Sequence, residues 1–367
     1  MSRGITDKMN KESIYKILRL ALGEEPTDFS EMSAQEWGWA FSTLSIHGLA
    51  ALGCVAVGKL PQDVRPPKEV VLKFISADMA TQQSYARLKK LADKIEAVLK
   101  LAGVKCLMLK GLSLADYYPV PYVRKFVDID LYAPDSGNVI DDAFKAKGVN
   151  VDTDFYRHSH MTLNGILVEN HHCLLDVRGR KKLADLDADL KKMAVSHLAT
   201  YDEPGLYYPD AQFSLIFNLH HAMSHFIYEG ISFKFLVDWI YFLRKERELL
   251  TTDQTASSLR EHGLLKFAAV ISEVSVRHLG LSIEDVPECI RIEMAALKPA
   301  VVDKFIDDLF RPYEQVHKKS IIAERMGNVR RIVKSAWKPR EFLGQSAIGF
   351  VWDKFLPILR GKKYEAD

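Results

Sequence analysis

The spacing of the apolar residues changes at Gly103, and this change constrains the fold more than any other feature of the chain. Pro66 and Pro67 open a helical pattern that continues to Gly103 without an internal glycine or proline, which predicts one long helix. Beyond Gly103 the apolar residues come in short runs of the kind that form strands. These runs lie at 104–109, 126–132 and 165–173, and a helix at 135–148 is followed by a fourth expected strand at 149–156.

Helical patterns occupy both ends of the chain. They lie at 10–24 and 33–60 on the N-terminal side, and at 210–228, 232–249, 254–281 and 288–309 on the C-terminal side. A strand-rich core between helices is an α+β arrangement. The sequence therefore predicts a helical region at 1–100, an α/β core at 101–208 and a second helical region at 209–367.

The composition is that of a globular protein, with 48% hydrophobic residues, 27% charged residues and a net charge of +2 over 367 residues. Four widely separated cysteines without paired spacing argue against a zinc ribbon or a disulfide framework, and they favour a reducing compartment. The chain starts with polar residues, and no stretch reaches about 18 uninterrupted apolar residues. We therefore expect a cytoplasmic protein without a transmembrane segment.

Two acids lie on one face of the strand expected at 126–132. Side chains alternate along a strand, so Asp128 and Asp130 point to the same side. Two adjacent carboxylates repel each other unless a cation lies between them, and Mg²⁺ prefers such oxygen ligands. Glu169 would complete a carboxylate triad for two metal ions if its strand, which also carries His171, lies next to this one. The alternative is a solvated strand with two surface aspartates.

Two pairs of histidines are candidate metal ligands. His221 and His225 are four residues apart on a helix, which is the spacing of a zinc site, but their motif lacks the glutamate of metalloproteases and no third ligand is evident. A polar position or a contact to substrate phosphate is the favoured interpretation. His158 and His160 alternate on an expected strand, and we interpret them as exposed residues of a loop or sheet edge rather than as ligands.

The ordered set of motifs resembles a known family. The sequence reads LKGLS at 109–113, then Arg124, VDIDL at 127–131, VENH at 168–171, and a helix with two histidines followed by Lys234 and Asp238. Over roughly residues 100–250 it is similar to the bacterial nucleotidyltransferase-like proteins of the polymerase-β superfamily known as uncharacterised nucleotidyltransferases. The resemblance implies a small mixed sheet and the transfer of a nucleoside monophosphate from ATP or another nucleoside triphosphate to an acceptor hydroxyl. It also implies Mg²⁺, or Mn²⁺ in its place, as the cofactor.

The resemblance also implies roles for individual residues. Gly111 and Ser113 would present backbone amides and a hydroxyl to the triphosphate, while Lys110 and Arg124 would neutralise phosphate charge. Asp128 and Asp130 would bind metal, and Glu169 would hold the ion nearer the attacking hydroxyl and help to deprotonate it. The remaining positions would contact substrate or support the ligands, with Asp238 anchoring one of the histidines. They are His171, His221, His225, Lys234 and Asp238.

Two other functions stay open at this point. One is a catalytically inactive nucleotide- or partner-binding module of the same fold, and the other is a phosphohydrolase that uses a transition metal bound by the histidines. The acceptor is unknown.

Residues 311–367 carry 13 Lys and Arg against 6 Asp and Glu, with apolar residues at helical spacing from 348 to 359. This segment could bind nucleic acid or a membrane surface, but packing onto the preceding helices is the favoured interpretation.

Overall fold

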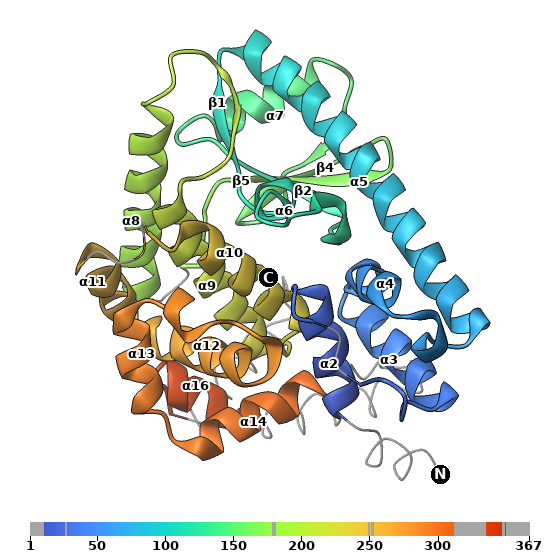
Figure 1. The fold of residues 1–367 in the computed structure, drawn as a ribbon. Coiled ribbons are helices and arrows are strands. Elements are labelled where there is room, and N and C mark those ends of the chain that lie inside the picture. Colours follow the sequence, from blue (N-terminus) through green and yellow to red (C-terminus); the bar gives the residue numbers. More distant parts are fainter. Residues whose placement is uncertain are drawn as a thin grey trace, which may run out of the picture.

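The computed structural model describes residues 11–25, 28–177, 181–248, 250, 253–311, 335–346 and 349. Within them, a mixed sheet of six strands is flanked by helices from both ends of the chain (Figure 1). The predicted α+β class is therefore confirmed.

The N-terminal helices lead into one long helix. They are α2 (Lys11–Ala21), α3 (Ala34–Ile46), α4 (Ala50–Lys59) and α5 (Lys68–Ala102), with a short 3-10 turn, η1 (Gln62–Val64), before α5. Ser33 and Glu36 form a reciprocal capping box at the start of α3. Gly103 ends α5 in the left-handed conformation, with φ of 69°, which favours glycine over residues that carry a Cβ. Figure 1 shows α5 running from the N-terminal helices to the sheet, as its uninterrupted pattern predicted.

The sheet has the strand order β3-β4-β5-β2-β1-β6. Its strands are β1 (Lys105–Met108), β2 (Asp128–Tyr132), β3 (Val151–Asp152), β4 (His158–Leu163), β5 (Ile166–His171) and β6 (Gly205–Tyr207). β2 runs parallel to β5 and antiparallel to β1, while β4 is antiparallel to both β3 and β5. The strand expected at 149–156 shortens to the two residues of β3, and β6 was not predicted.

The register of the sheet brings three distant residues into one row. Asp130 on β2 pairs with Glu169 on β5, and Glu169 pairs in turn with His160 on β4. Because paired residues of neighbouring strands point to the same face, the three side chains share one side of the sheet. The other side is covered by α7 (Gly137–Lys145), where Asn170 and Ser159 both donate to the buried Asp141 carboxylate. Those two bonds fix which face of β4 and β5 carries the acids and histidines.

Two connections complete the core region. The turn after β1 contains α6 (Leu112–Ala115) and is followed by the 3-10 turn η2 (Pro121–Val123), and α8 (Lys181–Leu198) joins β5 to β6. One apolar cluster fills the space between α5, α7 and the sheet. A second extends through the N-terminal and C-terminal helices, and in it the Tyr15 ring stacks on His278 at 4.4 Å. The domain boundaries at 100 and 208 stay a prediction.

The C-terminal helices are shorter than expected in two places. The described ones are α9 (Ala211–Tyr228), α10 (Phe233–Glu246), α11 (Asp253–Glu261), α12 (Leu265–Leu279), α13 (Glu288–Ala295), α14 (Pro299–Leu309) and α16 (Trp337–Phe342), with the 3-10 turn η4 (Ile283–Asp285) before α13. The helix expected at 254–281 is divided at Gly263, whose φ is 68°. The helix expected at 288–309 is divided before Pro299, which begins α14 because a proline is tolerated in the first turn of a helix.

Most of the basic segment at 311–367 lies outside the described residues, and so does the apolar pattern from 348 to 359, apart from residue 349. The lysine in the described part of this segment is a core residue: Lys338 is buried, and its Nζ lies 2.7 Å from the Asp308 carboxylate. Among the described helices, none is both long enough and apolar enough to cross a membrane.

Candidate active site

A cleft of about 1220 Å³ lies between the acid-bearing face of the sheet and the helices α9 and α10. Its lining includes Lys110 and Gly111 from the turn after β1, and the predicted triad of Asp128, Asp130 and Glu169. The structure therefore brings most of the residues singled out in the sequence to one place. The cleft is also large enough for two substrates, since pockets for one small molecule measure about 300–1000 Å³.

Asp130 is the most deeply buried acid of the cleft, with 1% of its surface exposed. Its Oδ1 lies 2.8 Å from Lys110 Nζ and 3.1 Å from His171 Nε2. Burial alone would raise the pKa of Asp130, but the Lys110 ammonium and the His171 contact outweigh burial and hold this pKa well below its usual range. The charge of Asp130 is thus already compensated by the protein.

Asp128 lies two residues earlier on the same face of β2. Burial, and then the negative charge of Asp130, raise the pKa of Asp128. Its ionised form is therefore less well stabilised than that of Asp130, although Lys110 reduces the shift. A bound cation would relieve this cost.

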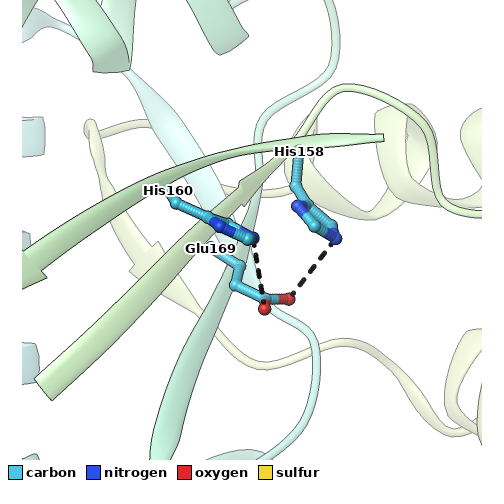
Figure 2. Close-up of side chains that lie close together, drawn as sticks. All are labelled: His158, His160 and Glu169. Atoms are coloured by element: carbon cyan, nitrogen blue, oxygen red, sulfur yellow. Dashed lines mark ion pairs between the residues drawn. The ribbon is translucent and has the colours of Figure 1, made fainter. Parts of the chain in front are cut away.

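Glu169 lies at the centre of a group of histidines. Its carboxylate oxygens are 3.6 Å from His171 Nε2, 3.9 Å from His158 Nε2 and 3.5 Å from His160 Nε2. Figure 2 shows the last two rings stacked side by side above the carboxylate. Burial opposes ionisation of Glu169, but the nearby histidines, His171 first, leave the pKa of Glu169 below its usual value.

The interpretation of His158 and His160 as exposed residues was wrong. His158 is only 8% exposed, and burial lowers its pKa to about 4. The reason is that β4 is not an edge strand, because β3 pairs with it on one side and β5 on the other. In addition, the Phe155 ring packs against His160 with ring centroids 4.1 Å apart.

The turn between β1 and α6 has a backbone that favours glycine. Gly111 has φ of 62°, and a Cβ at this position would lie 3.1 Å from the Phe126 ring. The Ser113 hydroxyl donates to the Lys110 carbonyl at 3.3 Å, and Ser113 is not among the residues that line the cleft. In this structure the hydroxyl therefore supports the turn instead of facing the space where a triphosphate would bind.

Arg124 and Asp238 form a closed ion pair behind that turn. Arg124 Nε and Nη2 donate to the two carboxylate oxygens of Asp238 at 2.7 and 3.0 Å, and the Tyr118 hydroxyl donates to Oδ1 at 2.6 Å. Nη1 also donates to the Gly111 carbonyl at 3.3 Å. The expectation that Asp238 anchors a histidine was wrong, because its oxygens are taken by Arg124 and Tyr118, and the guanidinium of Arg124 is committed to Asp238.

The helical wall of the cleft carries the remaining candidates. The rings of His221 and His225 are 4.5 Å apart, and His225 Nδ1 lies 2.9 Å from Glu229. Neither histidine belongs to a cluster of potential metal ligands among the described residues. Lys234 faces the same cleft, where burial and, next, the charge of Arg124 lower its pKa to about 8.

Comparison of the amino-acid sequence with known protein families shows which family the chain belongs to. The family described as uncharacterised nucleotidyltransferase matches residues 33–280. The chain belongs to this family. Comparisons with curated proteins and with solved structures give no significant match. The matched part of this nucleotidyltransferase-family chain contains the whole sheet together with α9 and α10, and hence every candidate residue of the cleft.

The donor set of this nucleotidyltransferase-family chain suits a divalent cation. Asp128, Asp130 and Glu169 offer oxygen ligands from two neighbouring strands, and the raised pKa of Asp128 indicates a carboxylate that a cation would stabilise. The residues that the sequence analysis missed are Tyr118, which completes the Arg124 cluster, and the two histidines of β4. The alternation of His158 and His160 was visible, but its phase relative to Glu169 depends on strand register.

Proposed function

We propose that this chain transfers a nucleoside monophosphate from a nucleoside triphosphate to an acceptor hydroxyl, with Mg²⁺ held by Asp128, Asp130 and Glu169. The observation that carries the proposal is the register of β2 and β5, which places Glu169 directly beside Asp130 in the cleft. Carboxylates on adjacent strands form a rigid donor set, as the shared binding of metal ions requires. Family membership supports the same reaction class.

The cationic side chains of the cleft are suited to a triphosphate. Lys110 lies beside Asp130 at one end of the turn, and Lys234 lines the cleft from α10. With a pKa of about 8, Lys234 is mostly protonated at neutral pH, although its burial makes that charge costly. An anion that binds there recovers the cost, so both lysines favour phosphate over a neutral ligand.

The proton of the acceptor hydroxyl has a defined neighbour. Glu169 is ionised at neutral pH because its pKa lies below the usual value, so its carboxylate accepts a hydrogen bond from an incoming hydroxyl and orients it. Mg²⁺, when bound, supplies charge neutralisation for the triphosphate and acidifies the attacking hydroxyl. Attack at the α-phosphorus forms a new phosphate ester and breaks the bond to pyrophosphate, while the proton passes to Glu169 or to solvent.

The closed pair of Arg124 and Asp238 holds the phosphate-binding turn in place. Arg124 donates to the Gly111 carbonyl, so the turn is tied to α10 through a buried contact. The backbone amides of this turn then keep their orientation when substrate enters. In this proposal Arg124 positions the turn and Lys110 contacts phosphate.

The test is the substitution Asp128→Asn. Because Asp128 is the least stabilised acid of the site, we expect its replacement to leave the folded protein intact and to weaken Mg²⁺-dependent ATP binding by at least about tenfold. Calorimetric titration with ATP and GTP, with and without MgCl₂, measures this effect. Appearance of the label from α-labelled ATP in acceptor material, with a fractionated cell extract as the source of acceptor, measures transfer.

The matched control is Asp142→Asn, which removes an exposed acid paired with Lys145 on the far side of the sheet. It should change neither binding nor transfer. Equal ATP affinity in the Asp128→Asn protein and the unmodified protein would contradict the proposal. Normal Mg²⁺-dependent binding without any label transfer would instead support the inactive binding module of the same fold.

A further inference from the structure

The histidines of β4 create a site that the carboxylate triad does not account for. His158 and His160 reach Glu169 from the neighbouring strand, and one ligand atom from each of the three residues lies within 4.8 Å of the others (Figure 2). The three residues are held by strand pairing, and the Phe155 ring packs against the outer histidine, His160. This is a preorganised cluster of two imidazoles and one carboxylate.

The distances in this cluster are too long for hydrogen bonds. Glu169 lies 3.5 Å from His160 Nε2 and 3.9 Å from His158 Nε2, whereas N–H···O bonds are about 2.7–3.2 Å long. Ligands bound about 2.0–2.1 Å from a tetrahedral ion lie about 3.3 Å from one another. The separations found here are therefore nearer to those of ligands around a common ion than to those of a hydrogen-bonded pair, and a small contraction would close the site.

The histidines also have unsatisfied nitrogen atoms. Within the described residues, the buried Nε2 of His160, which is the nitrogen that faces Glu169, has no hydrogen-bond partner. The Nδ1 of His158 is also buried without a partner, although that ring faces Glu169 through its Nε2. A buried polar atom without a partner destabilises the unliganded protein, so such atoms call for an explanation. Asp130 is different, because Lys110 and His171 already compensate its charge.

We propose that His158, His160 and Glu169 bind a first-row transition-metal ion, with Zn²⁺ bound more tightly than Mn²⁺ and both bound more tightly than Mg²⁺. Two imidazoles and one carboxylate are a ligand set that Zn²⁺ uses with an open fourth position for water or substrate. Mg²⁺ prefers oxygen ligands in an octahedral arrangement and discriminates against this set. The order of affinities follows from the general preference of nitrogen ligands along the first-row metals.

The inference deepens the proposed function at one residue, because Glu169 belongs to both ligand sets. It does not require nucleotide transfer, since the metal alone is the probe. A transition-metal ion at this place would be the one nearer the acceptor hydroxyl, beside the Mg²⁺ that Asp128 and Asp130, with Glu169, would hold together with the triphosphate. The chain would then have two metal positions with different metal preferences.

The experiment titrates metal-free full-length protein with ZnCl₂, MnCl₂ and MgCl₂ by calorimetry, and uses CoCl₂ as a spectroscopic probe. We expect one Zn²⁺ per chain at this site and the intense visible absorption of low-coordinate Co²⁺. His160→Ala should weaken Zn²⁺ binding by at least about 100-fold and remove that absorption. His160→Gln, which fills similar space, should behave like His160→Ala, and circular dichroism of both variants establishes that they fold.

Two further variants separate the possible failures. Asp128→Asn should retain Zn²⁺ binding while losing Mg²⁺-dependent ATP binding, so failure of the proposed function and failure of this inference give different results. His197→Gln changes a histidine of α8 that contacts the Tyr208 carbonyl, and it should leave Zn²⁺ binding unchanged. Absence of Zn²⁺ binding, equal binding by the His160→Ala protein, or loss of the ion on His221→Ala instead would each overturn the proposal.

Discussion

Two buried charged clusters border the cleft, and they differ in how fully their charges are satisfied. In the cluster of Arg124, Asp238 and Tyr118, both carboxylate oxygens accept hydrogen bonds, and the guanidinium donates to three acceptor atoms. In the cluster around Glu169, the nearest histidine nitrogens stay 3.5 Å or more away, and buried nitrogens of His158 and His160 have no hydrogen-bond partner among the described residues.

The difference separates a structural role from a functional one. A closed set of hydrogen bonds holds its members in one geometry and leaves little for a ligand to gain. An open set is costly in the unliganded protein and gains stability when a ligand completes it, which is why perturbed groups gather in functional sites. We therefore expect substitutions in the closed cluster to change stability most, and substitutions in the open cluster to change binding most.

The largest effect should come from Asp238→Ala, which opens the closed cluster. It leaves the buried Arg124 guanidinium without its counter-charge, and removal of one partner from a buried pair costs about 3–5 kcal/mol. Urea unfolding followed by circular dichroism measures the loss. Asp116→Ala, which breaks the exposed pair with Lys245, should cost only about 0–1 kcal/mol. A comparable loss in the two variants would show that the Arg124 cluster does not have the structural role given to it.

The pH dependence of triphosphate binding should follow the charge of Lys234 in the cleft. Lys234 has a pKa of about 8, lowered mainly by burial, so it loses its positive charge as the pH rises through that value. A bound triphosphate favours the protonated form, and we therefore expect affinity for ATP to fall by up to about tenfold between pH 7 and pH 9.5. Calorimetry across this pH range measures the decrease in ATP affinity.

Two variants test whether Lys234 causes this decrease in ATP affinity. Lys234→Met should bind ATP more weakly and show no decrease near pH 8. Lys234→Arg should keep the affinity at high pH, because a guanidinium stays protonated there. If the decrease near pH 8 persists in the Lys234→Met protein, another group is responsible.

The sequence predicted the helices and strands better than it predicted the contacts between them. The pattern before Gly103 has no interruption, so α5 follows directly from helical spacing, and the apolar runs of β1, β2 and β5 stand out because glycine or polar residues bound them. The three residues of β6 carry too short a pattern to be recognised. Gly263 and Pro299 divide helices that apolar spacing alone made continuous.

The site was predictable as far as its acids, because alternation on β2 places Asp128 and Asp130 on one face whatever the rest of the fold is. That Glu169 lies beside Asp130 depends on the pairing of β2 with β5, which joins residues far apart in the chain. Dependence on strand pairing also explains why the burial of His158 was not predicted, since this burial follows from the position of β4 between β3 and β5. The wrong prediction for Asp238 has a similar cause, because its partner Arg124 lies 114 residues away in the chain.

The smallest effect should come from Ser113→Ala, which separates support of the turn from contact with phosphate. The Ser113 hydroxyl donates to the Lys110 carbonyl and does not line the cleft, so we expect a loss of about 0.5–1.5 kcal/mol in unfolding free energy. Affinities for ATP and for adenosine should then decrease by a similar small factor, because both depend on the shape of the turn. Lys110→Ala should instead weaken ATP binding far more than adenosine binding, since it removes a charge from the cleft. Titration of each variant with both ligands gives the comparison. A selective loss of ATP affinity in the Ser113→Ala protein would mean that the hydroxyl turns toward the triphosphate when substrate binds.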